Sequence, residues 1–130
     1  MIEVKNLTKA FGKTKALDNI SFSVANGSIF GLVGSNGAGK STLLRIMAGV
    51  FQPDSGNVYL NGEAPFENNG IKARTAFVSD YPYFFPGATV ESMARYIKTL
   101  YPEWSEEKYK YLKTVFPMDT RMKISAMSKG

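Results

Sequence analysis

Apolar and polar positions along the first 80 residues follow the period of β-strands more often than that of helices. In residues 20–24 apolar and polar side chains alternate, as in a strand with one buried face. Asn26-Gly27 follows and predicts the tight turn of a β-hairpin. Short apolar runs bounded by turn residues share this character, and the strands they predict cover residues 2–4, 20–24, 28–33, 57–62 (with its turn) and 75–79.

Three other segments carry the longer period of an α-helix. Residues 42–48 form an apolar run that predicts a buried helix, ended by Gly49. Residues 90–100 place Met93, Ala94, Ile97 and Leu100 on one face, and Pro102 ends this second helix. The third helix begins near residue 105, where a serine cap precedes two glutamates, and ends at Pro117.

These elements predict two parts. Residues 1–80 are expected to form a mixed α/β part, and residues 81–130 a small helical part that begins with an aromatic, proline-containing loop. The whole chain is no longer than one typical domain, and no internal repeat is visible.

Composition narrows the chemistry. The chain has 130 residues, 44% of them hydrophobic, and contains neither cysteine nor histidine. This excludes disulfides, thiol catalysis, proton transfer by histidine and the usual zinc sites. No signal peptide and no apolar run of membrane-spanning length is present, so we expect a soluble, cytoplasmic protein. The net charge is +5, but the basic residues are scattered, so no nucleic-acid partner is expected.

The segment 34–42 is a complete phosphate-binding loop. Its sequence, Gly-Ser-Asn-Gly-Ala-Gly-Lys-Ser-Thr, satisfies the pattern G-x-x-x-x-G-K-[ST]. It lies between an expected strand and an expected helix, which is the context in which this motif binds nucleotides. A glycine-rich turn with a chance Lys-Ser is the alternative, and the flanking elements disfavour it.

Each position has a predicted role. The glycines allow backbone N–H groups to approach a phosphate, and the following helix adds the positive end of its dipole. Lys40 can reach the β- and γ-phosphates, and Ser41 can ligate Mg²⁺. The residues expected to bind nucleotide in this loop are Ser35, Asn36, Gly37, Ala38, Gly39, Lys40, Ser41 and Thr42.

Three further stretches, taken with the loop, are similar to a known family. They are Leu7–Gly12 with Ala16–Phe22, then Pro53–Gly62, and finally Ala126–Gly130. In sequence and spacing the chain resembles the ATP-binding subunit of ABC transporters over nearly its whole length. The resemblance implies a P-loop NTPase (ABC ATPase) α/β core with an N-terminal antiparallel β part, followed by the start of a helical subdomain.

The resemblance also assigns roles by position, with ATP and Mg²⁺ as the implied ligands. Phe11 matches the aromatic residue that stacks on adenine, with a core aromatic as the alternative. Ala16 matches a small residue beside the nucleoside. Asp80 stands where the family usually has the glutamine of the Q-loop; an aspartate can bind Mg²⁺ or water but cannot donate an amide hydrogen bond.

The family works through partners, and the resemblance implies them here. Ser128, Lys129 and Gly130 match the start of the signature motif, which contacts ATP on the opposite subunit of a homodimer or heterodimer. The loop 81–87 is expected to face an integral-membrane permease, with a locally packed aromatic cluster as the alternative. A permease partner would place the protein at the cytoplasmic face of the membrane. The segments 101–105 and 127–130 look most like subunits of ABC-2-type exporters.

The chain stops before the positions where the family has its Walker B acids and switch histidine. We therefore expect an N-terminal fragment of an ATPase, able to bind nucleotide but not to turn it over. The alternatives are a soluble ABC-type ATPase that acts on ribosomes or DNA, a small-molecule kinase, and a non-catalytic nucleotide-binding module.

Overall fold

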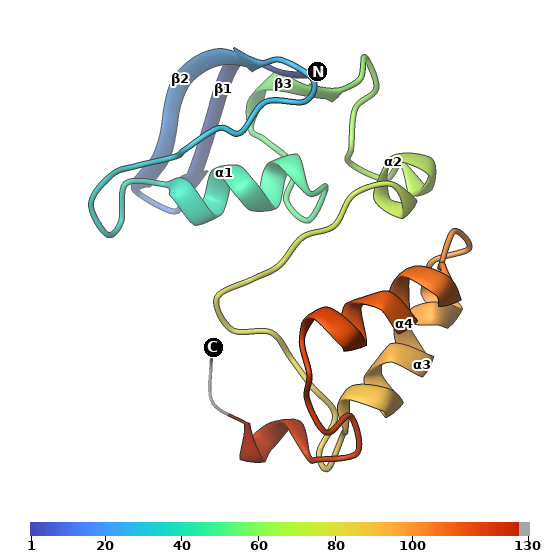
Figure 1. The fold of residues 1–130 in the computed structure, drawn as a ribbon. Coiled ribbons are helices and arrows are strands. Elements are labelled where there is room, and N and C mark those ends of the chain that lie inside the picture. Colours follow the sequence, from blue (N-terminus) through green and yellow to red (C-terminus); the bar gives the residue numbers. More distant parts are fainter. Residues whose placement is uncertain (128–130) are drawn as a thin grey trace. The chain divides into compact units, whose positions relative to one another are not determined.

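The computed structural model describes residues 1–127. Its contacts divide the chain into two compact units, one from Met1 to Phe77 and one that begins at Val78. The first unit holds a sheet and two helices, and the second is helical (Figure 1). Each unit is described by itself. The assignment of 1–80 to nucleotide binding and of 81–130 to a helical subdomain stays a prediction.

The first unit is built on a three-stranded antiparallel sheet. Its strands are β1 (Ile2–Phe11), β2 (Thr14–Val24) and β3 (Ser55–Leu60), in the order β2-β1-β3. The strands predicted within 2–4, 20–24 and 57–62 are confirmed, and β1 and β2 are longer than the alternation alone indicated. The antiparallel N-terminal sheet of the predicted fold class is therefore present.

The hairpin that joins β1 to β2 was not predicted from the sequence. Phe11 pairs with Thr14 across the two-residue turn Gly12-Lys13, and Gly12 has a φ of 58°. A two-residue hairpin turn with glycine at its first central position is one of the favoured types. Asn26-Gly27 does form a turn, but no paired strand follows it, so the hairpin expected there is absent.

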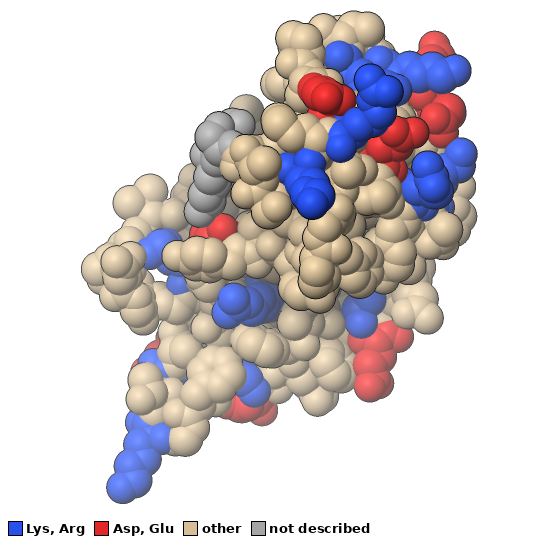
Figure 2. Space-filling model, turned by 90° about the horizontal axis from the view of Figure 1, so that it is seen from below, with Lys and Arg blue, Asp and Glu red and all other residues tan. Residues whose placement is uncertain are grey.

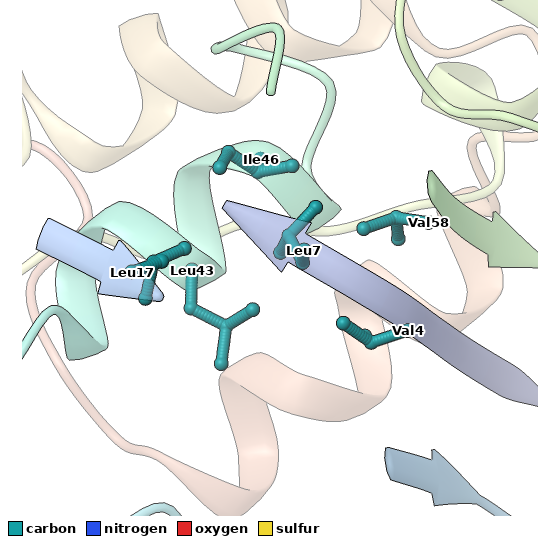
Figure 3. Close-up of a cluster of buried hydrophobic side chains, with 6 residues drawn as sticks. All are labelled: Val4, Leu7, Leu17, Leu43, Ile46 and Val58. Carbon is teal, nitrogen blue, oxygen red and sulfur yellow. The ribbon is translucent and has the colours of Figure 1, made fainter. Parts of the chain in front are cut away.

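The core of this unit lies between the sheet and α1 (Lys40–Met47) (Figure 3). Leu7 is 0% exposed and Ile46 is 1% exposed. Burying one such side chain contributes about 1.5–3 kcal/mol relative to leaving it in water. The cluster consists of Val4, Leu7, Leu17, Leu43, Ile46 and Val58.

The end of α1 depends on a glycine, as the sequence predicted. Gly49 has a φ of 69°, and its N–H donates to the carbonyl of Ile46 at 2.9 Å. A Cβ at Gly49 would lie 2.4 Å from the carbonyl oxygen of Pro65, so a larger residue does not fit. The short helix α2 (Asn69–Ala73) follows β3 and is capped by Asn68, whose side chain accepts from the Ile71 N–H.

Two predicted strands are wrong. Residues 28–33 and 75–79 belong to no strand, and Ile29, Val33 and Val78 are almost fully exposed. An apolar run forms a strand only where a neighbouring strand accepts its hydrogen bonds and other elements cover its faces. Within residues 1–127 neither segment has such a neighbour.

The second unit contains α3 (Val90–Leu100), α4 (Glu106–Val115) and the 3-10 turn η1 (Ile124–Ala126). Both predicted helices are confirmed. Thr89 and Ser92 form a reciprocal capping box at the start of α3, and the Ser105 hydroxyl accepts from the Lys108 N–H at 3.1 Å. No residue of α3 or α4 is buried.

Candidate phosphate-binding site

Gly39 brings the phosphate loop against β2. It caps α1 with a φ of 86°, a left-handed conformation that glycine adopts without strain. A Cβ at this position would lie 2.2 Å from the Ala16 carbonyl oxygen and 2.8 Å from Leu17 Cδ2. Residue 39 therefore has no room for any side chain, and its backbone lies directly beside Ala16.

The Lys40 side chain turns back into the loop. Its Nζ donates to the carbonyl oxygens of Gly34 and Ser35, at 2.7 Å each. The loop therefore holds a cation next to the N-terminus of α1, where the helix dipole is positive. The first turn of α1 contains no acidic residue that would compete with an anion.

A magnesium ion at this site would draw few ligands from the chain. Among residues 1–127 no group of three or more His, Cys, Asp or Glu residues could hold a metal. Ser41 is exposed in the first turn of α1, and Thr42 is half-buried. One hydroxyl fits the coordination of Mg²⁺, which commonly keeps several waters and takes further oxygens from substrate phosphates.

The remaining predicted residues of the first unit lie on the β1–β2 hairpin. Ala16 is brought against the loop through Gly39. Phe11 is 47% exposed, and its ring meets Phe51 edge to face with centroids 5.7 Å apart. The guanidinium of Arg45, in α1, lies over the Phe51 ring, 5.8 Å from its centroid. Phe11 is thus a partly open ring at the end of β1, not a residue of the buried core.

The other predicted site residues lie outside the first unit. Asp80 is exposed and belongs to the second unit, so its role as a Mg²⁺ or water ligand stays a prediction. Ser128, Lys129 and Gly130 lie outside the described residues. In the loop 81–87, Tyr83 and Phe85 pack edge to face at 5.8 Å, and Phe85 meets Tyr96 of α3 at 5.0 Å.

One contact beside Phe11 was missed by the sequence analysis. The Asp54 carboxylate accepts from Lys9 Nζ and from the Ala10 N–H, at 2.7 Å each. The bond from Lys9, followed by the one from Ala10, holds the pKa of Asp54 below its usual value. The partners are more than 40 residues apart, so no local pattern could have shown this pairing.

Charge is distributed rather than concentrated on the face shown in Figure 2. Among the described residues of that face, basic and acidic side chains lie interspersed. Several of the basic residues are paired with carboxylates, for example Lys98 with Glu106 at 3.0 Å and Arg74 with Glu63 at 3.0 Å.

Solved structures share this architecture. A structure described as the ATP-binding subunit of an ABC transporter superposes with a TM-score of 0.85 at 26% identity, over 99% of this chain and 56% of that one. A dimeric ATP-binding cassette bound to ADP and Pi gives a TM-score of 0.77 at 21% identity, over 98% of this chain and 63% of that one. The fold is that of an ABC-type P-loop NTPase.

The sequence leads to the same class. The family model described as ABC transporter matches residues 17–130. The chain belongs to the ABC transporter family, as its ATP-binding component. An uncharacterized ABC transporter ATP-binding protein of Methanocaldococcus jannaschii is 41% identical over 99% of this chain and 47% of its own length.

Relatives named for opposite directions of transport also match. The SkfA peptide export ATP-binding protein of Bacillus subtilis is 35% identical over 68% of this chain and 37% of its own length. A probable sulfate/thiosulfate import ATP-binding protein of Chlorella vulgaris is 40% identical over 68% and 38%. The comparisons therefore do not single out exporters, and the chain spans less than half the length of these relatives. No helix of residues 1–127 is both long and apolar enough to cross a bilayer.

Proposed function

We propose that this chain binds Mg-ATP through the loop 34–42. The observation that carries the proposal is the position of the Lys40 ammonium, held by two loop carbonyls beside the N-terminus of α1. Backbone N–H groups, a helix dipole and a mobile cation then act on one anion. This combination suits a nucleotide polyphosphate, whose negative charge is spread over several oxygens.

Each residue of the site has a part in the proposed complex. Lys40 would leave the loop carbonyls for the β- and γ-phosphates, and the backbone of residues 35–39 would donate to phosphate oxygens. Ser41 would ligate Mg²⁺, and Thr42 would donate to a phosphate oxygen. Phe11 would stack on the adenine ring, and Ala16 would lie beside the nucleoside.

In the intact protein we propose that this site is one half of an ATPase. Two subunits would hold ATP between the loop of one and Ser128–Gly130 of the other, with Asp80 near the metal or the attacking water. The dimeric neighbour with bound ADP and Pi supports this arrangement. The 130-residue sequence contains no histidine, and no strand within residues 1–127 ends in paired acids, so we propose that this chain binds without turnover.

The membrane partner is proposed to be a permease that docks on the aromatic loop 81–87. Tyr83 is 76% exposed, and exposed aromatic side chains are enriched at protein interfaces. This would place the protein at the cytoplasmic face of the membrane. An export role rests on the resemblance of 101–105 and 127–130 alone, because import proteins match as well.

Thermal unfolding with and without Mg-ATP tests the proposed binding. At about 100 times Kd, ligand binding adds ~2.7 kcal/mol to the free energy of unfolding. For a chain of this size the expected rise in Tm is several degrees. The variant Lys40→Ala should lose this rise because it removes the cation of the loop.

The matched control is Lys72→Ala, which removes an exposed lysine of α2 in the same unit. It should keep the full rise in Tm. A wild-type chain that melts at the same temperature with and without Mg-ATP would contradict the proposal. So would a rise that Lys40→Ala retains, because binding would then not use this loop.

A further inference from the structure

The turn after α1 holds the end of β1 that carries Phe11. Both carboxylate oxygens of Asp54 are used: one accepts from Lys9 Nζ and the other from the Ala10 N–H, at 2.7 Å each. The Asp54 N–H also donates to the Thr8 carbonyl at 3.0 Å. One residue thus makes three bonds to the three residues that precede Phe11.

The same contacts reach the ring itself. Lys9 Nζ, held by Asp54, lies 5.6 Å from the centroid of the Phe11 ring. Phe51, three residues before Asp54, meets the ring edge to face, and Arg45 of α1 lies over Phe51. Residues of the segment after α1 therefore position the Phe11 ring, and Arg45 links that segment back to α1, the helix that begins at the phosphate loop.

We propose that Asp54 is a positioning residue for the base-stacking ring, because it fixes the backbone at Ala10 and the ammonium of Lys9 beside Phe11. The inference rests on the proposed function, since it takes Phe11 as the residue that meets adenine. Asp54 bonds to Thr8, Lys9 and Ala10, so it would act on the base only through Phe11. Its effect is expected on recognition of the base and not on recognition of the polyphosphate.

Loss of Asp54 is expected to change the orientation of the Phe11 ring more than the stability of the fold. Asp54 is exposed, and an exposed ion pair contributes little to the stability of a fold. Phe11 is the last residue of β1 and is 47% exposed, so small shifts of this strand end would change the orientation of its ring. Stacking on an aromatic ring depends on that orientation, because the ring must offer its face to the base.

Titration with two different ligands distinguishes recognition of the base from recognition of the phosphates. Titration calorimetry of the intact chain with Mg-ATP measures base and phosphate recognition together, and titration with Mg-tripolyphosphate measures phosphate recognition alone. For Asp54→Asn we expect ATP affinity to fall about fivefold, as for loss of one charge-assisted contact. Affinity for tripolyphosphate should stay unchanged.

Two further variants serve as controls. Glu63→Gln removes another exposed carboxylate of the same unit, one that pairs with Arg74 and Asn68 away from Phe11. It should change neither affinity. Phe11→Leu should lower ATP affinity by about tenfold or more by removing the stacking ring, and adding Asp54→Asn to it should have no further effect, as expected for residues that act as a unit.

The outcomes are distinct. Equal loss of affinity for both ligands in Asp54→Asn would overturn the inference, since the residue would then support the fold and not the ring. Independent effects of Phe11→Leu and Asp54→Asn would overturn it too. A wild-type chain that binds tripolyphosphate but shows no preference for ATP overturns the role of Phe11 and leaves the phosphate site intact. A wild-type chain that binds neither ligand overturns the proposed function, and this inference with it.

Discussion

The two units of this chain are built with different degrees of burial. In the first, α1 covers one face of the sheet, and Leu7, Ile46 and Val4 are almost completely removed from water. In the second, among the described residues only Ala88 counts as a buried hydrophobic side chain. Yet α3 and α4 form as clearly as α1, with well-formed caps and polar links such as Lys98–Glu106.

The difference shows that helix formation and core formation are separate requirements. Caps, an acidic first turn and a proline stop are local signals, so they specify a helix without a partner surface. Burial needs two elements whose apolar faces match, as the sheet and α1 do. The helices of the second unit are therefore specified mainly by local bonds, whereas the first unit is organised around a packed core.

The largest effect should come from the packed core. Leu7→Ala removes a side chain that is 0% exposed, and we expect a loss of about 2–5 kcal/mol in the free energy of unfolding. The matched variant Leu112→Ala lies on α4, where the side chain is half-exposed, and should cost less than ~1 kcal/mol. Urea denaturation followed by circular dichroism measures both. Equal losses would show that Leu112 is covered in solution and would remove the contrast.

A smaller effect is expected from the capping box of α3. Thr89→Ala removes the acceptor of the Ser92 N–H and should cost ~1 kcal/mol, with a drop in helix content. Thr99→Ala lies in the same helix, where its hydroxyl bonds only to the Tyr96 carbonyl, and should leave helicity nearly unchanged. Circular dichroism at 222 nm measures helix content. If both variants behave alike, the local cap does not specify α3.

The smallest expected effect is the loss, at low pH, of the contribution that ionised Glu106 makes to stability. The hydrogen bond from Lys98, followed by that from Trp104, lowers the pKa of Glu106. A lowered folded-state pKa means that this contribution is complete above the unfolded-state pKa of Glu and is lost as pH falls through the folded-state pKa. Trp104 is the one tryptophan of the chain, so its fluorescence reports the change.

We expect the emission of Trp104 to change with a midpoint below 4.5, the ordinary value of the carboxyl. Glu106→Gln should abolish this step. Glu107→Gln, one residue further along α4, should keep it. If the fluorescence step persists in Glu106→Gln, a group other than the Glu106 carboxyl causes it, and the prediction is wrong.

Much of the site could be predicted because its signals are contiguous. The loop 34–42 and the helix after it follow from a local pattern, and in the structure Lys40 contacts the loop carbonyls while Gly39 lies against Ala16. Whether residues 28–33 and 75–79 form strands could not be predicted from a local pattern. Their apolar runs are real, but a strand is defined by its neighbour, and the sequence of one segment does not show whether a neighbour is present.

Short stretches of sequence were enough to predict the phosphate-loop motif and the ends of the helices, and a resemblance carried by such stretches indicated the family. These are properties of short stretches, and short stretches carry their own hydrogen bonds and backbone preferences. Only the tertiary structure decided that Asp54 joins Lys9 and Ala10, and that Gly39 lies against Ala16. Such contacts join residues far apart in the chain, and folding brings them together through the burial of Leu7 and its neighbours between the sheet and α1.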